Sequence, residues 1–362
     1  MSGFMARFSW YGFFAGMVCF FSWTAWGAPA PAKAKGKLII SDSQEIRSLQ
    51  AETFKFLQQM KFGELEANAR KFRRENKRFR DGSWMLAAFY KGLTTPTERL
   101  DESDGVRFMS LPDSAMVVSL LEKWALADPE SATARIALGH AYIDMAWALR
   151  GDEAAVKVSA ERWKPFEERL GLARRILFEA ESLKSDDPSL YHALLRLGLA
   201  QGWKRPEFEV VYEKGAALAP QYDLIHLAKA IYLLPQWMGQ GGDWQRFAHE
   251  VAQKRGDKDG AILYTRIAWG VALYLGGGER IFKEQNIPWS AMKKGFKCLM
   301  DEYPGSNLNM NWFCRFACLA GDAGEARLQM MKIGNRMELE VWGSFESFER
   351  WREWVSNRDD QR

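Results

Sequence analysis

"LADPESATARIALGHAY", residues 126–142, contains the pattern that decides the fold. Pro129 follows one helical segment and opens the next, since proline interrupts a helix interior and suits a first turn. Leu138 and Gly139, nine and ten residues later, place a large side chain beside a small one. Two antiparallel helices that pack closely need this combination where their axes approach. The stretch therefore predicts a tightly packed helical hairpin.

The same turn recurs at Pro188, Pro220 and Pro304. Small residues again stand ten positions later, and large apolar ones stand nine positions later except at Lys229; these residues are Gly198, Ala230, Cys314, Leu197 and Phe313. The prolines are 59, 32 and 84 residues apart, so only one spacing is near a helical repeat of about 34 residues. Strand-like alternation is essentially missing. We therefore predict an all-α fold, with an irregular array of helical hairpins over residues 114–335.

One part of this array resembles a known repeat. Leu138-Gly139 with Tyr142 resembles the L-G-x-x-Y core of tetratricopeptide repeats. Gly321 and Ala326 stand where that repeat has its turn glycine and second-helix alanine, and Phe313 stands where it has its first-helix leucine. The resemblance implies a tetratricopeptide-like right-handed solenoid, and such solenoids present concave surfaces that bind peptides or protein segments.

Two further stretches resemble a narrower family. They are "GSWMLAAFYKGL", residues 82–93, and "LLPQWMGQGGDWQRFAHEVA", residues 233–252. Both are similar to signatures of domain of unknown function 4034, an uncharacterised bacterial family of exported helical proteins. This resemblance implies a helical fold and brings no activity with it.

The N-terminus has the layout of a secretory signal peptide. Arg7 is the only charged residue before Lys33, and residues 8–26 are apolar and aromatic. Ala25 and Gly27 stand where a cleavage site needs small residues. We predict a signal peptide over residues 1–27, a flexible tether over 28–40 and an α-helical repeat domain over 41–362. The expected location is periplasmic or secreted. The alternative is an inner-membrane protein anchored by residues 8–26, because that run approaches the roughly 20 residues that span a bilayer.

The basic stretch "ARKFRRENKRFRDG", residues 69–82, raises the question of a charged partner. Export and a net charge of only +4 argue against nucleic acid, whose binders carry a strong basic excess. We predict an N-terminal hairpin over residues 41–93, in which the helix that carries the basic stretch ends at Asp81-Gly82, with Phe72 and Phe79 in the core. The remaining basic residues are expected on a solvated face. The alternative is contact with an anionic membrane surface through Arg70, Arg73, Arg74 and Lys77.

Residues 235–248 form a motif rich in tryptophan and glycine. We expect Pro235 to end one helix, the glycines to form a turn, and Asp243 to act as the N-cap of the next helix. Indole rings offer apolar area and an N–H donor for sugars or peptides. A ligand-binding groove is therefore predicted from these residues: Trp237, Asp243, Trp244, Tyr264 and Trp269, with Trp203 beside them.

No catalytic template is recognisable. The sequence contains no His-Glu-x-x-His helix, no phosphate-binding loop and no G-x-S-x-G turn. We predict no catalytic residues, no cofactor and no metal. Beyond the signal segment, Cys298, Cys314 and Cys318 are interpreted as buried helical residues. Cys314 and Cys318 share one helical face, and a bridge from Cys298 to either of them stays open.

The C-terminal stretch "VWGSFESFERWREWV", residues 341–355, repeats aromatic residues every three positions. We predict an aromatic helix over residues 340–356 that caps the end of the array. The alternative is an exposed aromatic face for a partner or membrane.

Together these features predict an exported helical-repeat scaffold of the bacterial envelope that binds a protein or peptide. The runner-up is an envelope enzyme acting on cell-wall or carbohydrate material near residues 235–248, and a third reading is a structural envelope component. A deep pocket holding carboxylates with perturbed pKa values would favour the enzyme. A broad channel would favour peptide binding.

Overall fold

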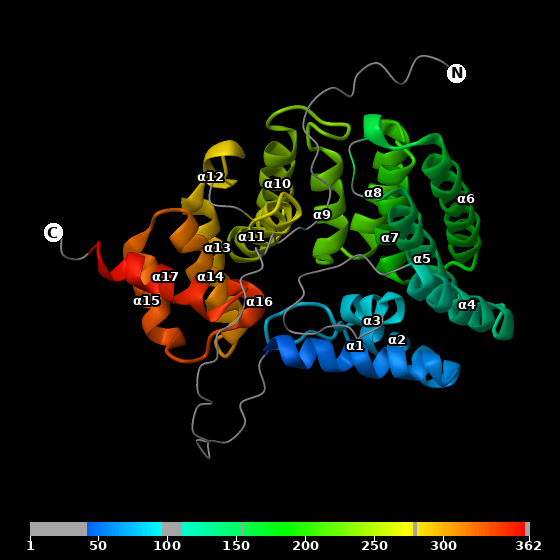
Figure 1. Ribbon diagram of the computed structural model, residues 1–362, viewed down its shortest axis with the longest axis horizontal. Helices are drawn as coiled ribbons and strands as arrows, with labels where there is room; N and C mark the ends of the chain where they lie inside the picture. Colours follow the sequence, from blue (N-terminus) through cyan, green and yellow to red (C-terminus); the bar gives the residue numbers. More distant parts are fainter. Residues whose placement is uncertain (1–41, 96–110, 152, 154, 278–280, 359–362) are drawn as a thin grey trace.

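The computed structural model describes residues 42–95, 111–151, 153, 155–277 and 281–358 (Figure 1). Within these ranges the regular structure is helical, and the only β-type pairing is a single bridge between Arg78 and Trp84. The predicted all-α class is therefore confirmed. The predicted signal peptide, tether and anchor lie outside the described residues. None of the helices in the described ranges is long and apolar enough to cross a membrane.

The helices fall into three groups along the chain. The N-terminal group is α1 (Asp42–Gln58), α2 (Phe62–Arg74) and α3 (Met85–Thr94). The middle group is α4 (Leu111–Ala127), α5 (Ala132–Arg150), α6 (Ala160–Ser182), α7 (Pro188–Ala200), α8 (Arg205–Leu218), α9 (Asp223–Tyr232), α10 (Asp243–Gln253) and α11 (Asp257–Tyr274), with the 3-10 turn η2 (Ala155–Lys157) before α6. The C-terminal group is α12 (Ile281–Glu284), α13 (Trp289–Glu302), α14 (Asn307–Leu319), α15 (Ala323–Ile333), α16 (Leu339–Trp342) and α17 (Phe345–Ser356).

The middle helices form two layers. Each helix from α4 to α11 packs against the next one in sequence. In addition, α5, α7, α9 and α11 pack side by side, so they form one layer. Helices α6, α8 and α10 each lie between two members of that layer and form the second.

Small residues mark the closest approaches, as the sequence predicts. A methyl group at Gly139 would overlap the buried Leu177 side chain of α6. At Gly198 an added Cβ would lie 2.7 Å from the Trp203 ring. Lys229, which breaks the pattern, is buried beside Glu209, and its Nζ lies 3.9 Å from the centre of the Tyr212 ring. A paired cation there takes the place of an apolar side chain.

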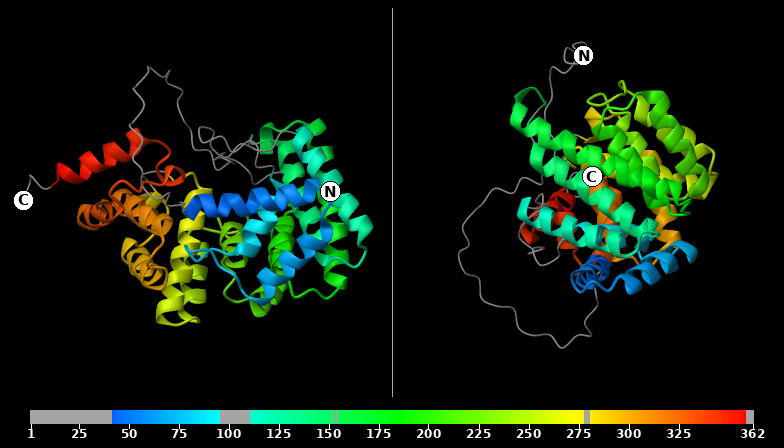
Figure 2. Two further views of the ribbon diagram at one scale, coloured as in Figure 1. Left: turned by 90° about the horizontal axis from the view of Figure 1, so that it is seen from below. Right: turned by 90° about the vertical axis from the view of Figure 1, so that its right-hand side faces the viewer.

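The N-terminal group lies across helices that are distant in sequence (Figure 2). Helix α1 contacts both α4 and α14, and α3 contacts α5 and α7. The Asp42 carboxylate accepts hydrogen bonds from Ser306 Oγ at 2.7 Å and from the Leu308 N–H at 3.0 Å. The Asp81 carbonyl accepts from Arg266 and Asn309. Residues 42–95 therefore connect the middle of the array to its C-terminal part.

The predicted end of the second helix is wrong. Helix α2 ends at Arg74, seven positions before Asp81, where the turn is predicted. Asn76 adopts a left-handed backbone conformation with φ of 47°, which a helix cannot continue and which asparagine tolerates better than most residues. Residues 75–84 form an irregular segment before α3.

The predicted C-terminal helix is also divided. Gly343, with φ of 77°, separates α16 from α17. Trp342 and Phe348 are buried, whereas Phe345 is 59% exposed. Helix α17 packs against α15. Because the chain changes direction at Gly343, the aromatic residues do not share one face: some are buried in the C-terminal group and Phe345 is exposed.

Candidate functional site

A polar cavity of about 220 Å³ lies between α3, α5, α7 and α9. His140 and Asp144 come from α5, and His192 and Arg196 come from α7. Each pair is four residues apart, a spacing that places both side chains on one helical face. Lys91 of α3 completes the charged lining. Because α5 and α7 are neighbours in one layer, the two polar faces meet.

Arg196 organises the floor of this cavity. Its Nη1 donates to His140 Nδ1 at 2.9 Å, and its Nη2 donates to Asp144 Oδ1 at 2.5 Å. A guanidinium is always protonated and can only donate. His140 Nδ1 is therefore the acceptor, and the proton of the neutral imidazole resides on Nε2. That Nε2–H is buried, and the Ser189 backbone is the acceptor that acts on this imidazole.

The protonation states follow from burial and neighbouring charge. Burial lowers the pKa of His140 well below its usual range, and the charges of Arg196 and Lys91 lower it further, against a smaller opposite effect of the Ser189 backbone. Burial likewise lowers the pKa of His192, with His140 and Arg196 adding to it. Burial alone would raise the pKa of Asp144, but Arg196 and Lys91 bring it below its usual value. At neutral pH the cavity therefore holds two neutral imidazoles, one carboxylate and two cations.

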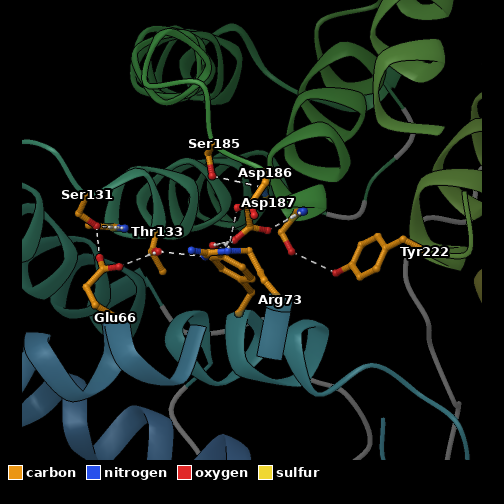
Figure 3. A network of polar contacts seen from close by, with 11 residues as sticks. Glu66, Arg73, Ser131, Thr133, Ser185, Asp186, Asp187 and Tyr222 are labelled. Carbon is orange, nitrogen blue, oxygen red and sulfur yellow. Dashed lines mark hydrogen bonds and ion pairs between the residues drawn. The ribbon is translucent and has the colours of Figure 1, made fainter. Parts of the chain in front are cut away.

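A second network of polar contacts (Figure 3) shares lining residues with this cavity. Asp187 is fully buried and accepts hydrogen bonds from Tyr90 Oη at 2.7 Å, Arg73 Nη1 at 2.8 Å and the Ser189 N–H at 2.9 Å. The Ser189 hydroxyl in turn bonds to the Tyr222 hydroxyl at 3.1 Å. Tyr90, Ser189 and Tyr222 also line the cavity, so the network fixes its walls.

This network corrects one prediction for the basic stretch. Arg73 is not on a solvated face, because its side chain is only 15% exposed and is paired with Asp187. Arg70 and Arg74 are exposed, and Lys77 is half-buried beside Glu75 at 3.4 Å. The four surface candidates are therefore not equivalent.

The two phenylalanines of the basic stretch are where the sequence predicts them. Phe72 is 5% exposed and Phe79 is 4% exposed. The prediction that both belong to the core is confirmed. Between them, Arg73 also lies 3.3 Å from Thr133 Oγ1 on α5, so this part of α2 is in contact with the array.

The predicted groove of aromatic residues is not assembled. Trp244 is 1% exposed and Tyr264 is 6% exposed, so both belong to the core. Trp237 is half-buried and donates its Nε1–H to Tyr274 Oη at 2.8 Å, and Trp269 is half-buried in the same core cluster. A surface groove cannot include Trp244 and Tyr264.

The predicted cap at Asp243 is also wrong. Gly242, with φ of 88°, is the N-cap of α10, and Asp243 is the first helical residue. The Asp243 carboxylate accepts from the N–H of Gln240, three residues before it, at 2.9 Å. It stabilises the preceding turn instead of the helix end.

Sequence reasoning missed the polar cavity. Its signal is a pair of polar residues four positions apart within two otherwise apolar helices, "IALGHAYIDMA" and "LYHALLRLG". Each pair taken alone resembles an exposed helical face. Only their meeting across α5 and α7 makes a site.

The described residues contain no group of three metal-binding side chains. Cys298, Cys314 and Cys318 are free thiols, and burial raises the pKa of Cys314 well above its usual range. Comparisons with family models, with curated proteins and with solved structures found no match for this chain.

Proposed function

We propose that this chain is an exported binding protein of the bacterial envelope, built as a tetratricopeptide-like right-handed solenoid. The two layers of α5–α11 support this proposal, because helical-repeat arrays stack hairpins in the same way. The layer of α5, α7, α9 and α11 is the inner one, since its members contact one another directly. Its surface is where such arrays hold a protein or peptide partner.

The N-terminal group narrows the space for a partner. Helices α1 and α3 already lie against α4, α5, α7 and α14. Part of the inner surface is therefore covered and is not available to an extended peptide. The polar cavity between α3, α5, α7 and α9 is the place where a ligand group can enter. The observation that carries the proposal is the meeting of two polar helix faces, His140 with Asp144 and His192 with Arg196, around a cavity of about 220 Å³, because buried polar groups are costly unless a partner or a ligand satisfies them.

Catalysis is the second candidate, since the cavity gathers titratable groups. Its arrangement favours binding. Asp144 is ion-paired with a lowered pKa, so it is no proton donor at neutral pH. The Ser189 hydroxyl bonds to Tyr222 rather than to an imidazole, so no nucleophile is activated by a neighbouring base.

Site-directed photo-crosslinking in native cells tests the binding role. A photo-reactive residue replaces Leu224, which lines the cavity, and a control replaces Phe178, which is exposed on α6. We expect a discrete adduct only from the Leu224 position, and Lys91→Gln should reduce it. Equal labelling from both positions, or none from Leu224, contradicts a partner at the cavity.

The proposed export of the protein has its own test. A signal peptide over residues 1–27 predicts that N-terminal sequencing of the mature protein starts near residue 28. Recovery of the intact N-terminus in the membrane fraction would instead support the anchor at residues 8–26.

A further inference from the structure

We infer that the cavity between α3, α5, α7 and α9 binds a carboxylate, either the acidic side chain of a peptide or a small free acid, with Lys91 as the main counter-charge. This inference rests on the proposed binding function and names the chemistry of its ligand. Three independent features of the cavity support an anionic occupant.

The first feature is the charge balance of the lining. Arg196 and Asp144 neutralise each other at 2.5 Å. Lys91 is exposed and lines the cavity. Its positive charge helps to lower the pKa of Asp144. The lining therefore carries one cation in excess, which suits a carboxylate. A phosphate dianion is usually held by several cations or by an array of backbone N–H groups.

The second feature is the supply of donors. His140 accepts from Arg196 at Nδ1, so its own proton is on Nε2, which is buried beside the Ser189 backbone, and the free donors of the lining come from Arg196. Arg196 has five N–H groups, and two of its nitrogens contact His140 and Asp144. A carboxylate accepts several hydrogen bonds and donates none, so it can take the remaining N–H groups of Arg196.

The third feature is the N-terminus of α9. Tyr222 and Leu224 line the cavity, and no side chain caps this helix end. The N-terminal end of a helix carries a partial positive charge that stabilises anions. The neighbouring Asp223 carboxylate lies 4.0 Å from Arg266, so its negative charge is partly balanced there.

NMR titration of the histidine imidazoles tests the inference with three probes. Glutarate represents a free acid, acetyl-Ala-Glu-Ala-amide represents an acidic peptide, and acetyl-Ala-Gln-Ala-amide is its neutral match. We expect an acidic probe to shift the signals of His140 and His192. The signals of His226, bonded to Pro220 in the core, and of His249 on α10 are internal references.

Two lysine variants give the decisive comparison. Lys91→Gln should weaken binding of the acidic probe about fivefold, the value of one partly screened ion pair. Lys164→Gln removes an exposed lysine of α6 that does not line the cavity, and it should leave the affinity unchanged. Far-UV circular dichroism of both variants checks that they fold.

Each outcome decides the inference. Shifts from an acidic probe that Lys91→Gln weakens support it, and the better of the two acidic probes identifies the source of the carboxylate. Binding of glutarate alone, with no crosslink from Leu224, retains the carboxylate site and overturns the peptide partner. Equal binding of the Gln peptide, or equal loss in both lysine variants, overturns the carboxylate site. A crosslink that persists in that case leaves the binding function standing.

Discussion

Arg73 offers the sharpest test of the structure, because three arginines of one helix have different environments. Arg70 and Arg74 are exposed, whereas Arg73 pairs with the fully buried Asp187. Burial lowers the pKa of Arg73, but Asp187, Tyr90 and Asp186 outweigh it and raise that pKa above its usual value. The Arg73 guanidinium is therefore charged in the folded protein.

The expected cost of Arg73→Gln follows from what Asp187 retains. Removing one partner of a buried ion pair costs about 3–5 kcal/mol, because it leaves the other charge uncompensated. Asp187 still accepts from Tyr90 Oη and the Ser189 N–H, and the Arg73 side chain is 15% exposed. We therefore expect the lower end, about 3 kcal/mol. Arg70→Gln and Arg74→Gln should each cost less than about 0.5 kcal/mol.

Urea unfolding, followed by far-UV circular dichroism at pH 7, measures these differences. Asp187 is the N-cap of α7. The double variant Arg73→Gln with Asp187→Asn removes the stranded charge, and asparagine is also a good N-cap. It should cost less than the sum of the two single changes, with a coupling of about 0.5–3 kcal/mol. Phe72→Ala, at about 3–5 kcal/mol, sets the scale for a core truncation on the same helix.

The reasoning is refuted if Arg73→Gln is as mild as Arg70→Gln. In that case the contact with Asp187 does not hold α2 against α7 in solution. A large effect from Arg70→Gln or Arg74→Gln would equally contradict the structure, since it leaves both side chains exposed.

Two further predictions concern protonation and packing. Burial lowers the pKa values of His140, His192 and His226 in the folded state, so below about pH 6.5 the unfolded chain binds more protons than the folded one. The free energy of unfolding should therefore fall from pH 7 to pH 5.5, by at most about 1.4 kcal/mol per pH unit for each histidine; an unchanged or higher urea midpoint at pH 5.5 contradicts this. Gly92→Ala should destabilise by about 1–3 kcal/mol, because its Cβ would lie 2.7 Å from the Gln50 carbonyl oxygen of α1. Gly171→Ala on α6, where nothing lies within 4 Å of the added Cβ, should stabilise the protein by about 0.5–1 kcal/mol. Thermal unfolding measures both variants, and similar effects of Gly92→Ala and Gly171→Ala would contradict the α1–α3 contact.

The sequence by itself determined the helical class and much of the core. Gly139 and Gly198 mark close helix approaches, and Phe72 and Phe79 are buried. These features are predictable because helical periodicity is local: it states which face of a segment is apolar within a few turns.

The tertiary structure alone decided which polar groups find partners. Arg73 and Arg74 are neighbours in the sequence, yet only Arg73 meets Asp187, which is 114 positions away. In the same way, the polar pair of α5 and the polar pair of α7 form a cavity only because those helices are adjacent. Periodicity gives each polar residue a direction on its own helix. Whether the polar side chain is then solvated or paired depends on which distant helix packs against that face. No local sequence pattern contains that information.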